Sequence, residues 1–586
     1  TITSMESNVL ETLSVIGNKS ISITLDKSAA VTAIPLTKID GSGHSGSRLT
    51  VTAGSADSGV TVTTGAAALT VTLGDGVNTV TGTAGDDTVT TGDGADTISV
   101  GEGDNTVTSG DGANTITAGD GGNTITDGEG VGTITVGSGN NTITLADGAD
   151  VLVAGSGNNT ITNKAGNATI TSGDGESTVT NTAGNSTITL GDGGNTVNLT
   201  AGNSTVVTGD LADDINITAG NNNITSGAGN DTISLGSGSD TVDAGAGTDA
   251  VDFSVTGGTW TGSISNAEAV TATFGGSSTI DFTGISDYDT IAVTANATAT
   301  TTKLKNLAAS TITVTDDSVE TGGDGNIVDL TIDTVDDAAI TLKIGANQEA
   351  ATAAETDLES ITLTDAASLA ITLAGGSFTN VLEHDVNGIA LDDNETTSIS
   401  LTTAAYTGID TGAITGTESN ESITVTASGA EADVTIGAVA DATNLETLSV
   451  TASGLNAQVD LGQVGATTAG IASTITMSAS NGADLTLTGD GDAETDAEAV
   501  GDISVSENVT TFTISADGVG SSATIGRLDA DALEVETMSV TASNGGLVDM
   551  ETAAGNLLIN YLPGALTLET SGTGSIVNAD GITEDA

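Results

Sequence analysis

The sequence GDGANTITAGDGGNTIT occupies residues 110–126, and within it Gly, Asp, Gly, Asn and a Thr-Ile-Thr triplet return with a nine-residue period. Starting at Leu73, the repeat x-Gly-Asp-Gly-x-Asn/Asp-Thr-Val/Ile-Thr continues in one frame to Asp252, which makes 20 repeats. Position 8 is Val, Ile or Leu in every repeat, and two degenerate repeats at residues 55–72 precede the array in the same frame. A period sustained over this length predicts a solenoid.

Each repeat combines one short strand with one tight turn. Side chains alternate along a strand, so the Ile of Thr-Ile-Thr faces one side and the two threonines face the other. The remaining six positions are mostly Gly, Asp, Asn and Ser, which favour turns with positive φ. Two repeats therefore close one coil, in which the two position-8 side chains meet in a narrow core. The array predicts about ten coils and a rod about 48 Å long.

The composition limits the partners that the chain can have. The 586 residues include only 2% aromatics and carry a formal net charge of -69. Nine basic residues cannot form a phosphate-binding face, so we expect no nucleic-acid partner. No apolar run reaches the roughly 18 residues of a membrane span, so we expect no membrane insertion. The absence of Cys excludes disulfides and thiol chemistry.

Acidic residues recur at position 3, where a solenoid stacks each turn over the turn two repeats earlier. Neighbouring carboxylates about 5 Å apart would repel by about 1 kcal/mol in bulk water and about 3 kcal/mol at an effective dielectric of about 20. Lys164 is the only cation in the array. We therefore predict several bound Ca²⁺ ions, because calcium is a hard cation that takes carboxylate and carbonyl oxygens. The position-3 candidates are Asp75, Asp93, Asp111, Asp120, Asp147, Asp174, Asp192 and Asp210.

The repeats resemble the RTX nonapeptide, G-G-x-G-x-D-x-U-x, of calcium-bound parallel β-rolls. The most similar segments are AGDDTVT (84–90), TGDGADTIS (91–99), SGAGNDTIS (226–234) and LGSGSDTVD (235–243). In that family the Asp at position 6 binds calcium together with carbonyls of the glycine turn. The resemblance implies that the position-6 ligands here are Asp87, Asp96, Asp150, Asp213, Asp231, Asp240 and Asp249, with Asp86 beside them as a further candidate.

Position 6 departs from the RTX pattern in the middle of the array. It is often Asn, and from Ala168 to Ser186 it is Ala or Ser. Asn lacks the charge that makes a tight site, so we expect strong calcium sites near both ends of the array. Weaker or absent sites are expected around repeats 10 to 15. In the alternative interpretation, the Asn residues stack as amide ladders and the Asp residues only shape the turns.

The flanking residues lose the nine-residue frame but remain rich in short alternating strands. A loose cassette recurs in them as NVLETLSV (8–15), TDLESITLT (356–364), NLETLSVTASG (444–454) and VETMSVTASN (535–544). We expect each copy to begin a module of several coils or a small sandwich. The predicted fold is all-β, with a parallel β-roll or β-solenoid of RTX type flanked by further β-solenoid or β-sandwich modules.

The predicted domains follow these changes of pattern. They are a β-rich N-terminal module at 1–54 that continues a larger chain, the RTX β-roll at 55–252, β modules at 253–355, 356–443 and 444–534, and a C-terminal β segment at 535–586.

The cassettes, alternating with Thr/Ala/Gly-rich strands beside RTX repeats, resemble bacterial surface-layer proteins of the calcium-dependent, type I-secreted kind. The resemblance implies an extracellular structural protein at a bacterial cell surface. Its partners would be copies of itself in a lattice or sheath and, through a part not present in this sequence, cell-surface polysaccharide. We recognise no C-terminal secretion signal or cell-anchoring domain, and therefore expect a segment of a longer polypeptide.

The alternative function is a calcium-dependent RTX adhesin segment that binds a host, a glycan or ice. Position 7 is Thr in 16 of the 20 repeats, which resembles the Thr-x-Thr rank of ice-binding solenoids. Exposed strands also favour Thr for reasons unrelated to ice.

Enzyme chemistry finds little support, and we predict that the chain is not an enzyme. The only histidines are His44 and His384, both expected in surface loops, and neither G-x-S-x-G nor H-E-x-x-H occurs. A further acidic cluster, DGDAETDAE at 490–498, has oxygens at alternate positions. Asp490, Asp492 and Glu494 are therefore additional calcium-ligand candidates, with a solvated loop as the alternative.

Overall fold

The structure is a computed structural model, and its regular elements are almost entirely β-strands. It describes residues 2–5, 9–25, 35–54, 58–255, 257–274, 276–295, 301–308, 310–316, 329–344, 360–373, 382–391, 398–415, 422–439, 446–464, 474–487, 503–504, 511–525, 528–529, 537–549, 557–558, 565–578 and 582–583. Over these ranges the only helix is one 3-10 turn, η1 (Phe282–Gly284). The chain divides into a first compact unit, Thr1–Phe253 with Gly262–Ala269 and Ile285–Tyr288, and a second one formed by the remainder.

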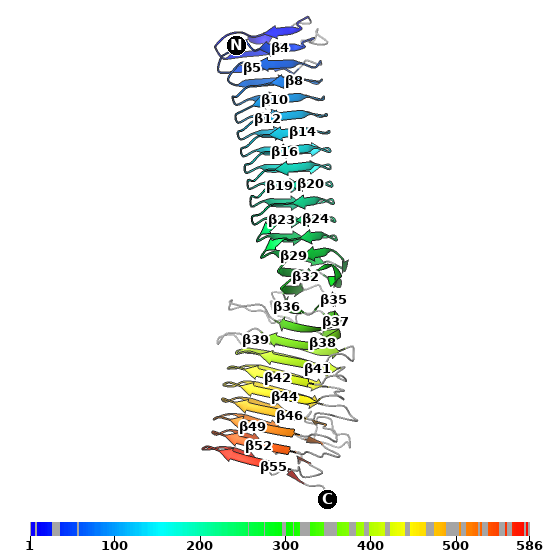
Figure 1. Cartoon of the computed structure of the whole chain (residues 1–586), viewed down its shortest axis with the longest axis vertical. Coiled ribbons are helices and arrows are strands. Elements are labelled where there is room, and N and C mark those ends of the chain that lie inside the picture. The colour runs from blue at the N-terminus through cyan, green and yellow to red at the C-terminus, as the bar shows by residue number, and fades with distance from the viewer. Residues whose placement is uncertain are drawn as a thin grey trace. The chain divides into compact units, whose positions relative to one another are not determined.

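The first unit is built from two parallel sheets whose strands alternate along the chain (Figure 1). The first sheet contains β1 (Ile2–Met5), β3 (Ile21–Leu25), β5 (Leu49–Ala53), β7 (Leu69–Leu73), β9 (Thr88–Thr90), β11 (Thr106–Thr108), β13 (Thr124–Thr126), β15 (Thr142–Asp147), β17 (Thr160–Ala165), β19 (Thr178–Asn181), β21 (Thr196–Leu199), β23 (Asp214–Ile217), β26 (Thr232–Leu235) and β29 (Ala250–Val255). The second contains β2 (Thr12–Ser14), β4 (Lys38–Gly41), β6 (Thr61–Thr64), β8 (Thr79–Thr81), β10 (Thr97–Gly101), β12 (Thr115–Ala118), β14 (Thr133–Val136), β16 (Val151–Ala154), β18 (Thr169–Ser172), β20 (Thr187–Thr189), β22 (Thr205–Val207), β24 (Asn223–Thr225), β27 (Thr241–Asp243) and β31 (Ser263–Ser265). Two short strands, β25 (Ala228–Gly229) and β28 (Ala246–Gly247), pair within the turns.

The register of the strands confirms the coil of two repeats. Thr97 pairs with Thr115 and Ile98 with Ile116, so each strand lies beside the strand two repeats later. The position-8 side chains form the core, and both Ile98 and Ile116 are at most 1% exposed. Apolar side chains at position 1, such as Leu145, add a second buried row, which the period of the repeat alone does not predict.

Position 4 is Gly in 19 of the 20 repeats, Leu211 being the exception, and the close stacking of the turns favours it. Gly112 has a φ of +135°, which side-chain-bearing residues rarely adopt. A Cβ atom at Gly112 would lie 2.1 Å from the carbonyl oxygen of Gly94, one coil earlier. Glycine at this position, as at Gly112, therefore lets successive turns stack at the spacing of paired strands.

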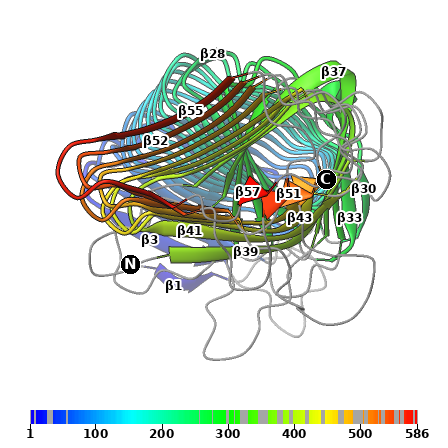
Figure 2. The ribbon, with the colours of Figure 1, turned by 90° about the horizontal axis from the view of Figure 1, so that it is seen from below.

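The second unit is also a parallel β-solenoid. Its strands are β30 (Gly258–Trp260), β32 (Ala269–Phe274), β33 (Ser278–Asp281), β34 (Thr290–Ala295), β35 (Thr301–Leu307), β36 (Ser310–Asp316), β37 (Asp329–Ile344), β38 (Ser360–Leu373), β39 (Leu382–Leu391), β40 (Ser398–Thr403), β41 (Thr407–Thr415), β42 (Ser422–Ser428), β43 (Asp433–Val439), β44 (Thr447–Ser453), β45 (Gln458–Val464), β46 (Thr474–Ser480), β47 (Asp484–Leu487), β48 (Ile503–Ser504), β49 (Thr511–Asp517), β50 (Ser522–Ile525), β51 (Leu528–Asp529), β52 (Thr537–Ser543), β53 (Leu547–Asp549), β54 (Leu557–Leu558), β55 (Ala565–Ser571), β56 (Ile576–Asn578) and β57 (Ile582–Thr583). The end-on view shows successive strands such as β52 and β55 lying over one another (Figure 2).

The cassettes at 444–454 and 535–544 form rungs of one ladder in this unit, whereas the cassette at 356–364 pairs with β39 in a different ladder. Thr447 of β44 pairs in register with Thr474 of β46, which pairs with Thr511 of β49 and then Thr537 of β52. The coil length is not constant along this ladder, because the chain between β46 and β49 is much longer than that between β40 and β42. The predicted all-β fold is therefore confirmed, and in these residues the flanking architecture is the solenoid and not the sandwich. The predicted domain boundaries stay predictions.

One expectation about the first unit is wrong. His44 does not lie in a surface loop, because it is fully buried and its Nε2 is 2.7 Å from the carbonyl oxygen of Lys19. The side chain of His384 lies outside the described part of the chain. The described residues also include no helix of sufficient length and hydrophobicity to cross a membrane.

Replacing one position-8 side chain should test the core of the array. Ile125 is fully buried, so Ile125→Ala is expected to lower the unfolding free energy by about 2–5 kcal/mol through lost burial and a residual cavity. Urea denaturation in excess calcium would measure the change. The neighbouring Thr124 faces solvent, and Thr124→Ala should cost no more than about 1 kcal/mol. Equal losses from the two variants would contradict the assigned core.

Candidate metal sites

Position 6 of each repeat is buried between successive turns, and its side chain, which only Gly132 lacks, turns inward. Two columns result, and each takes its members from every second repeat. The odd column, from odd-numbered repeats, contains Asn78, Asp96, Asn114, Gly132, Asp150, Ala168, Ser186, Ser204, Asn222 and Asp240. The even column contains Asp87, Asn105, Asn123, Asn141, Asn159, Ser177, Asn195, Asp213, Asp231 and Asp249. All twenty residues are buried.

The same hydrogen bond connects Asn and Asp residues along these columns. The backbone N–H at position 6 donates to the Oδ1 atom of the position-6 residue one coil later. Asn123 donates to Asn141 Oδ1 at 3.1 Å, and Asp231 donates to Asp249 Oδ1 at 2.8 Å. One side-chain oxygen is thus used in the same way whether the residue is Asn or Asp.

The second side-chain atom distinguishes Asn from Asp. The Nδ2 atom of Asn123 lies 3.0 Å from Gly119 O, 3.2 Å from Gly121 O and 3.0 Å from Asn141 Oδ1. These oxygens come from positions 2 and 4 of the same repeat and from position 6 of the next coil, and we call the space among them the turn pocket. An amide NH₂ is a donor and satisfies these acceptors without an ion. The amide ladder therefore describes the run Asn105, Asn123, Asn141 and Asn159.

An Asp at position 6 supplies an acceptor where Asn supplies a donor. Because Oδ1 is held in the same way, the carboxylate Oδ2 takes the place of the amide nitrogen in the turn pocket. These Oδ2 atoms are buried and have no hydrogen-bond partner within the described ranges in Asp96, Asp150, Asp213, Asp231, Asp240 and Asp249. Asp87 differs, because its Oδ2 accepts from the backbone N–H of Thr83 at 3.1 Å.

Burial makes these unpaired carboxylates costly. Desolvation raises the pKa of the carboxyls of Asp213, Asp231 and Asp240 above the usual aspartate value, against hydrogen bonds that lower it. An unsatisfied buried acceptor costs roughly 1–3 kcal/mol, and more when it is charged. A pocket lined by carboxylate and carbonyl oxygens without a donor fits Ca²⁺, which prefers such ligands.

The densest run of these carboxylates lies at the end of the even column. Asp213, Asp231 and Asp249 follow one another in successive coils, and each accepts from the N–H of the column residue before it. The N–H of Asp249 in turn donates to Glu268 Oε2 at 2.6 Å. Desolvation, and then the charges of Asp231 and Glu268, raise the pKa of Asp249. Glu268 therefore extends the column by one more carboxylate.

Sequence reasoning missed Glu268 because it lies beyond the last repeat and one place out of step with the nine-residue frame. The available clue was its position immediately before a strand, since β32 begins at Ala269. Position 6 has the same relation to its strand throughout the array.

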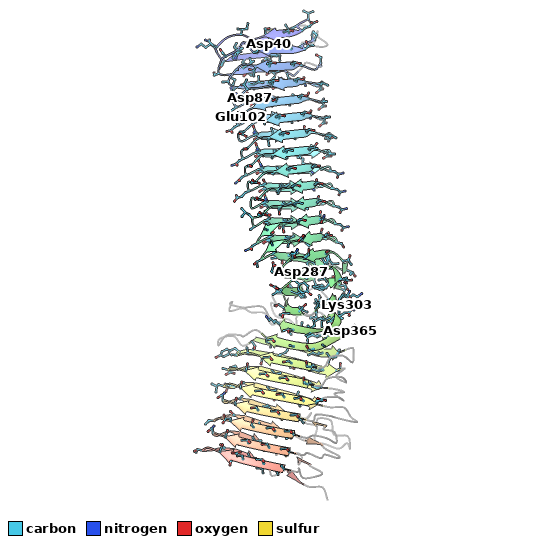
Figure 3. All side chains as sticks on the ribbon, in the orientation of Figure 1. Asp40, Asp87, Glu102, Asp287, Lys303 and Asp365 are labelled. Carbon is cyan, nitrogen blue, oxygen red and sulfur yellow. The ribbon has the colours of Figure 1, made fainter. Side chains whose placement is uncertain are left out.

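The acidic residues at positions 3 and 5 lie outside the turn pocket. Asp75, Asp86, Asp93, Asp111, Asp120, Asp147, Asp174, Asp192 and Asp210 are all exposed. Several accept a backbone N–H from the next coil, as when Asp93 donates to Asp75 Oδ1 at 3.0 Å and Asp104 donates to Asp86 Oδ1 at 3.0 Å. Figure 3 labels one residue of each kind on neighbouring coils, the buried Asp87 and the exposed Glu102. The structure thus groups position-6 residues with turn carbonyls and keeps position-3 residues at the surface.

The remaining candidates cannot be placed in the same way. Asp490, Asp492 and Glu494 lie outside the described residues. Where the structure describes the chain, no three His, Cys, Asp or Glu side chains gather closely enough to hold a metal by themselves. Backbone carbonyls must therefore supply much of any calcium coordination.

Comparison with known families identifies the repeats. The sequence profile of the RTX calcium-binding nonapeptide repeat (4 copies) matches residues 72–107, 108–143, 126–161 and 217–251. Searches of curated proteins and of solved structures gave no match. The matched parts of the array are therefore RTX calcium-binding nonapeptides, a repeat that is typical of secreted proteins.

The raised pKa values predict how pH affects the metal-free array. A carboxyl whose pKa is raised in the folded state binds protons more readily there than when unfolded. Metal-free stability should therefore increase as pH falls from 7 toward the usual aspartate value of 3.8. Calcium should reverse this dependence, because the ion competes with the proton. Urea midpoints of chelator-treated chain at several pH values would measure the effect.

A matched pair of variants separates this effect from general charge repulsion. Replacing Asp213, Asp231 and Asp249 with Asn should flatten the dependence of the urea midpoint on pH. Replacing the exposed Asp174, Asp192 and Asp210 with Asn removes equal charge but should leave most of the dependence intact. Metal-free stability that instead decreases on acidification over this range would contradict the burial argument.

Proposed function

We propose that the chain is an extracellular structural protein in which calcium stiffens the RTX array and copies assemble into a surface layer or sheath on a bacterial cell. The observation that carries the proposal is the set of buried Asp Oδ2 atoms in a family of calcium-binding repeats. A catalytic role is not part of it, because the acidic residues serve the turns of a repeated scaffold.

Calcium in the turn pockets acts as a cross-link between coils. Each pocket combines oxygens of one turn with the position-6 side chain of the next coil, as the Asn123 contacts demonstrate. An ion in an Asp pocket would therefore bind two successive coils together and neutralise the carboxylate between them. The absence of Cys means that such contacts take the place of disulfides as rigid links.

The exposed carboxylates support the assembly part of the proposal. Position-3 acids form rows along the turns, and the chain carries a net charge of -69. Two copies of so negative a protein cannot pack closely without counter-ions. Divalent ions between such rows would allow copies to adhere, which makes assembly dependent on calcium and sensitive to chelators.

Calcium removal should destabilise the two kinds of turn pocket unequally. Hydrogen exchange with and without chelator would compare the backbone amides of Asn105 and Asn123 with those of Asp213 and Asp231, because all four make the same bond to the next coil. The Asp amides should lose protection on chelation and regain it at roughly 0.1–1 mM calcium. The Asn amides should retain more protection. An identical response of both groups would count against ion-filled Asp pockets.

Electron microscopy of the purified chain tests the assembly. With calcium, sheets or tubes are expected, and chelation should disperse them. Persistently isolated rods under conditions where hydrogen exchange shows calcium binding would instead support the adhesin alternative, in which the chain is a tether.

A further inference from the structure

Repeat 7, at residues 127–135, has no side chain at position 6. Gly132 occupies that place in the odd column, between Asn114 and Asp150. Its N–H still donates to Asp150 Oδ1, at 2.7 Å, as elsewhere in the column. A Cβ atom at Gly132 would lie 1.9 Å from Asp127 Oδ2. The carboxyl group of Asp127, from position 1 of the same repeat, therefore fills the volume of the missing side chain.

In two other repeats a position-1 side chain likewise takes the place of a small position-6 side chain, but there it is an amide. Asn163 at position 1 accompanies Ala168 at position 6, and Asn181 accompanies Ser186. The Nδ2 atoms of Asn163 and Asn181 donate to the position-4 carbonyls of Gly166 and Gly184, each at 3.2 Å. A position-1 side chain can thus reach the turn pocket, and an Asn there satisfies the carbonyl.

Asp127 brings an acceptor into the same place. Its Oδ1 accepts from Ser109 Oγ at 2.5 Å and from Asn114 Nδ2 at 2.8 Å. Its Oδ2 has no partner among the residues that the structure describes, and neither does Oδ2 of Asp150. Asp127 is 2% exposed and Asp150 is fully buried. Desolvation raises the pKa of both carboxyls, and the charge of Asp127 adds to the shift at Asp150.

The oxygens of this pocket lie close together. The Cβ position of Gly132 is 1.9 Å from Asp127 Oδ2 and 3.2 Å from Asp150 Oδ1, so these two oxygens are at most 5.1 Å apart, the sum of the two distances. The Cβ position of Gly148 is 1.6 Å from Gly130 O and 2.9 Å from Asp150 Oδ1, which places that pair within 4.5 Å by the same addition. One ion with ligand distances of about 2.3–2.6 Å can reach oxygens separated in this way.

We propose that Asp127 and Asp150, with the carbonyl of Gly130, hold a calcium ion in the middle of the array through a ligand from position 1. This inference rests on the calcium role proposed above. A single shared proton would cancel only one of the two negative charges of this carboxylate pair, whereas a divalent cation cancels both. Lys164, the only cationic side chain of the array, is exposed and does not supply the charge. Calcium suits the pocket better than magnesium, which dehydrates reluctantly and demands octahedral geometry.

Asp127→Asn tests the site, because it installs the amide that Asn163 and Asn181 use. Calcium bound per whole chain would be counted by equilibrium dialysis at saturating calcium, with circular dichroism to verify folding. The variant should bind one ion fewer than the native chain. Asp104→Asn, which removes an exposed position-5 carboxylate outside the position-3 rows, should leave the count unchanged.

Several outcomes would overturn the site. An unchanged count in folded Asp127→Asn excludes it and leaves a shared proton as the explanation of the unpaired oxygens. The proposed function is tested separately, because an unchanged count in this variant leaves calcium binding by the native chain intact. If the variant does not fold, lanthanide-soaked crystals of the native chain decide the question. An anomalous peak between Asp127 and Asp150 supports the site, whereas peaks at Asp231 and Asp249 without one there exclude it.

Discussion

The structure of the array depends on how the oxygens of each turn pocket are satisfied. Stacking the turns places the carbonyls of positions 2 and 4 beside the position-6 side chain of the next coil, as around Asn123. Water has little access to these buried groups, so something inside must pair with them. An Asn supplies two N–H groups, whereas an Asp supplies another acceptor and requires a cation. Whether the position-6 side chain carries an amide nitrogen or a second carboxylate oxygen thus determines whether a coil depends on calcium.

The two sets of acidic residues experience different electrostatics. The position-3 carboxylates lie in water, where salt screens their repulsion beyond about 10 Å at 0.1 M ionic strength. Hydrogen bonds such as that from Asp93 N–H to Asp75 Oδ1 also stabilise them. The buried carboxylates of the array are screened less by salt, and all but Asp87 leave one oxygen without a hydrogen bond among the described residues. Burial accordingly raises the pKa of Asp213. The requirement for a cation inside the coils is therefore stronger than the repulsion among the exposed rows, although the sequence pattern alone drew attention to the latter.

The sequence predicts the array well because its period is fixed by stacking. The coil of two repeats and the buried spine follow from the spacing of Ile98, Ile116 and their equivalents. The sequence could not separate inward from outward acids, since Asp at positions 3 and 6 differ only in how the turn directs them. Glu268 and Asp127 were missed because each stands outside position 6. In the second unit the coil length changes between rungs, so the cassettes gave no regular period from which a solenoid could be deduced.

The alternation of the two sheets restricts how the array can change in length. Removing a single nonapeptide would move every later strand to the opposite sheet and exchange the odd and even columns beyond the deletion. Asn and Asp residues would then meet new neighbours, and Asp127 could be separated from Asp150. Removing two adjacent repeats preserves the sheets and the columns. Duplication or loss during evolution is therefore expected to favour pairs of repeats, and an engineered array should be shortened or lengthened by whole coils.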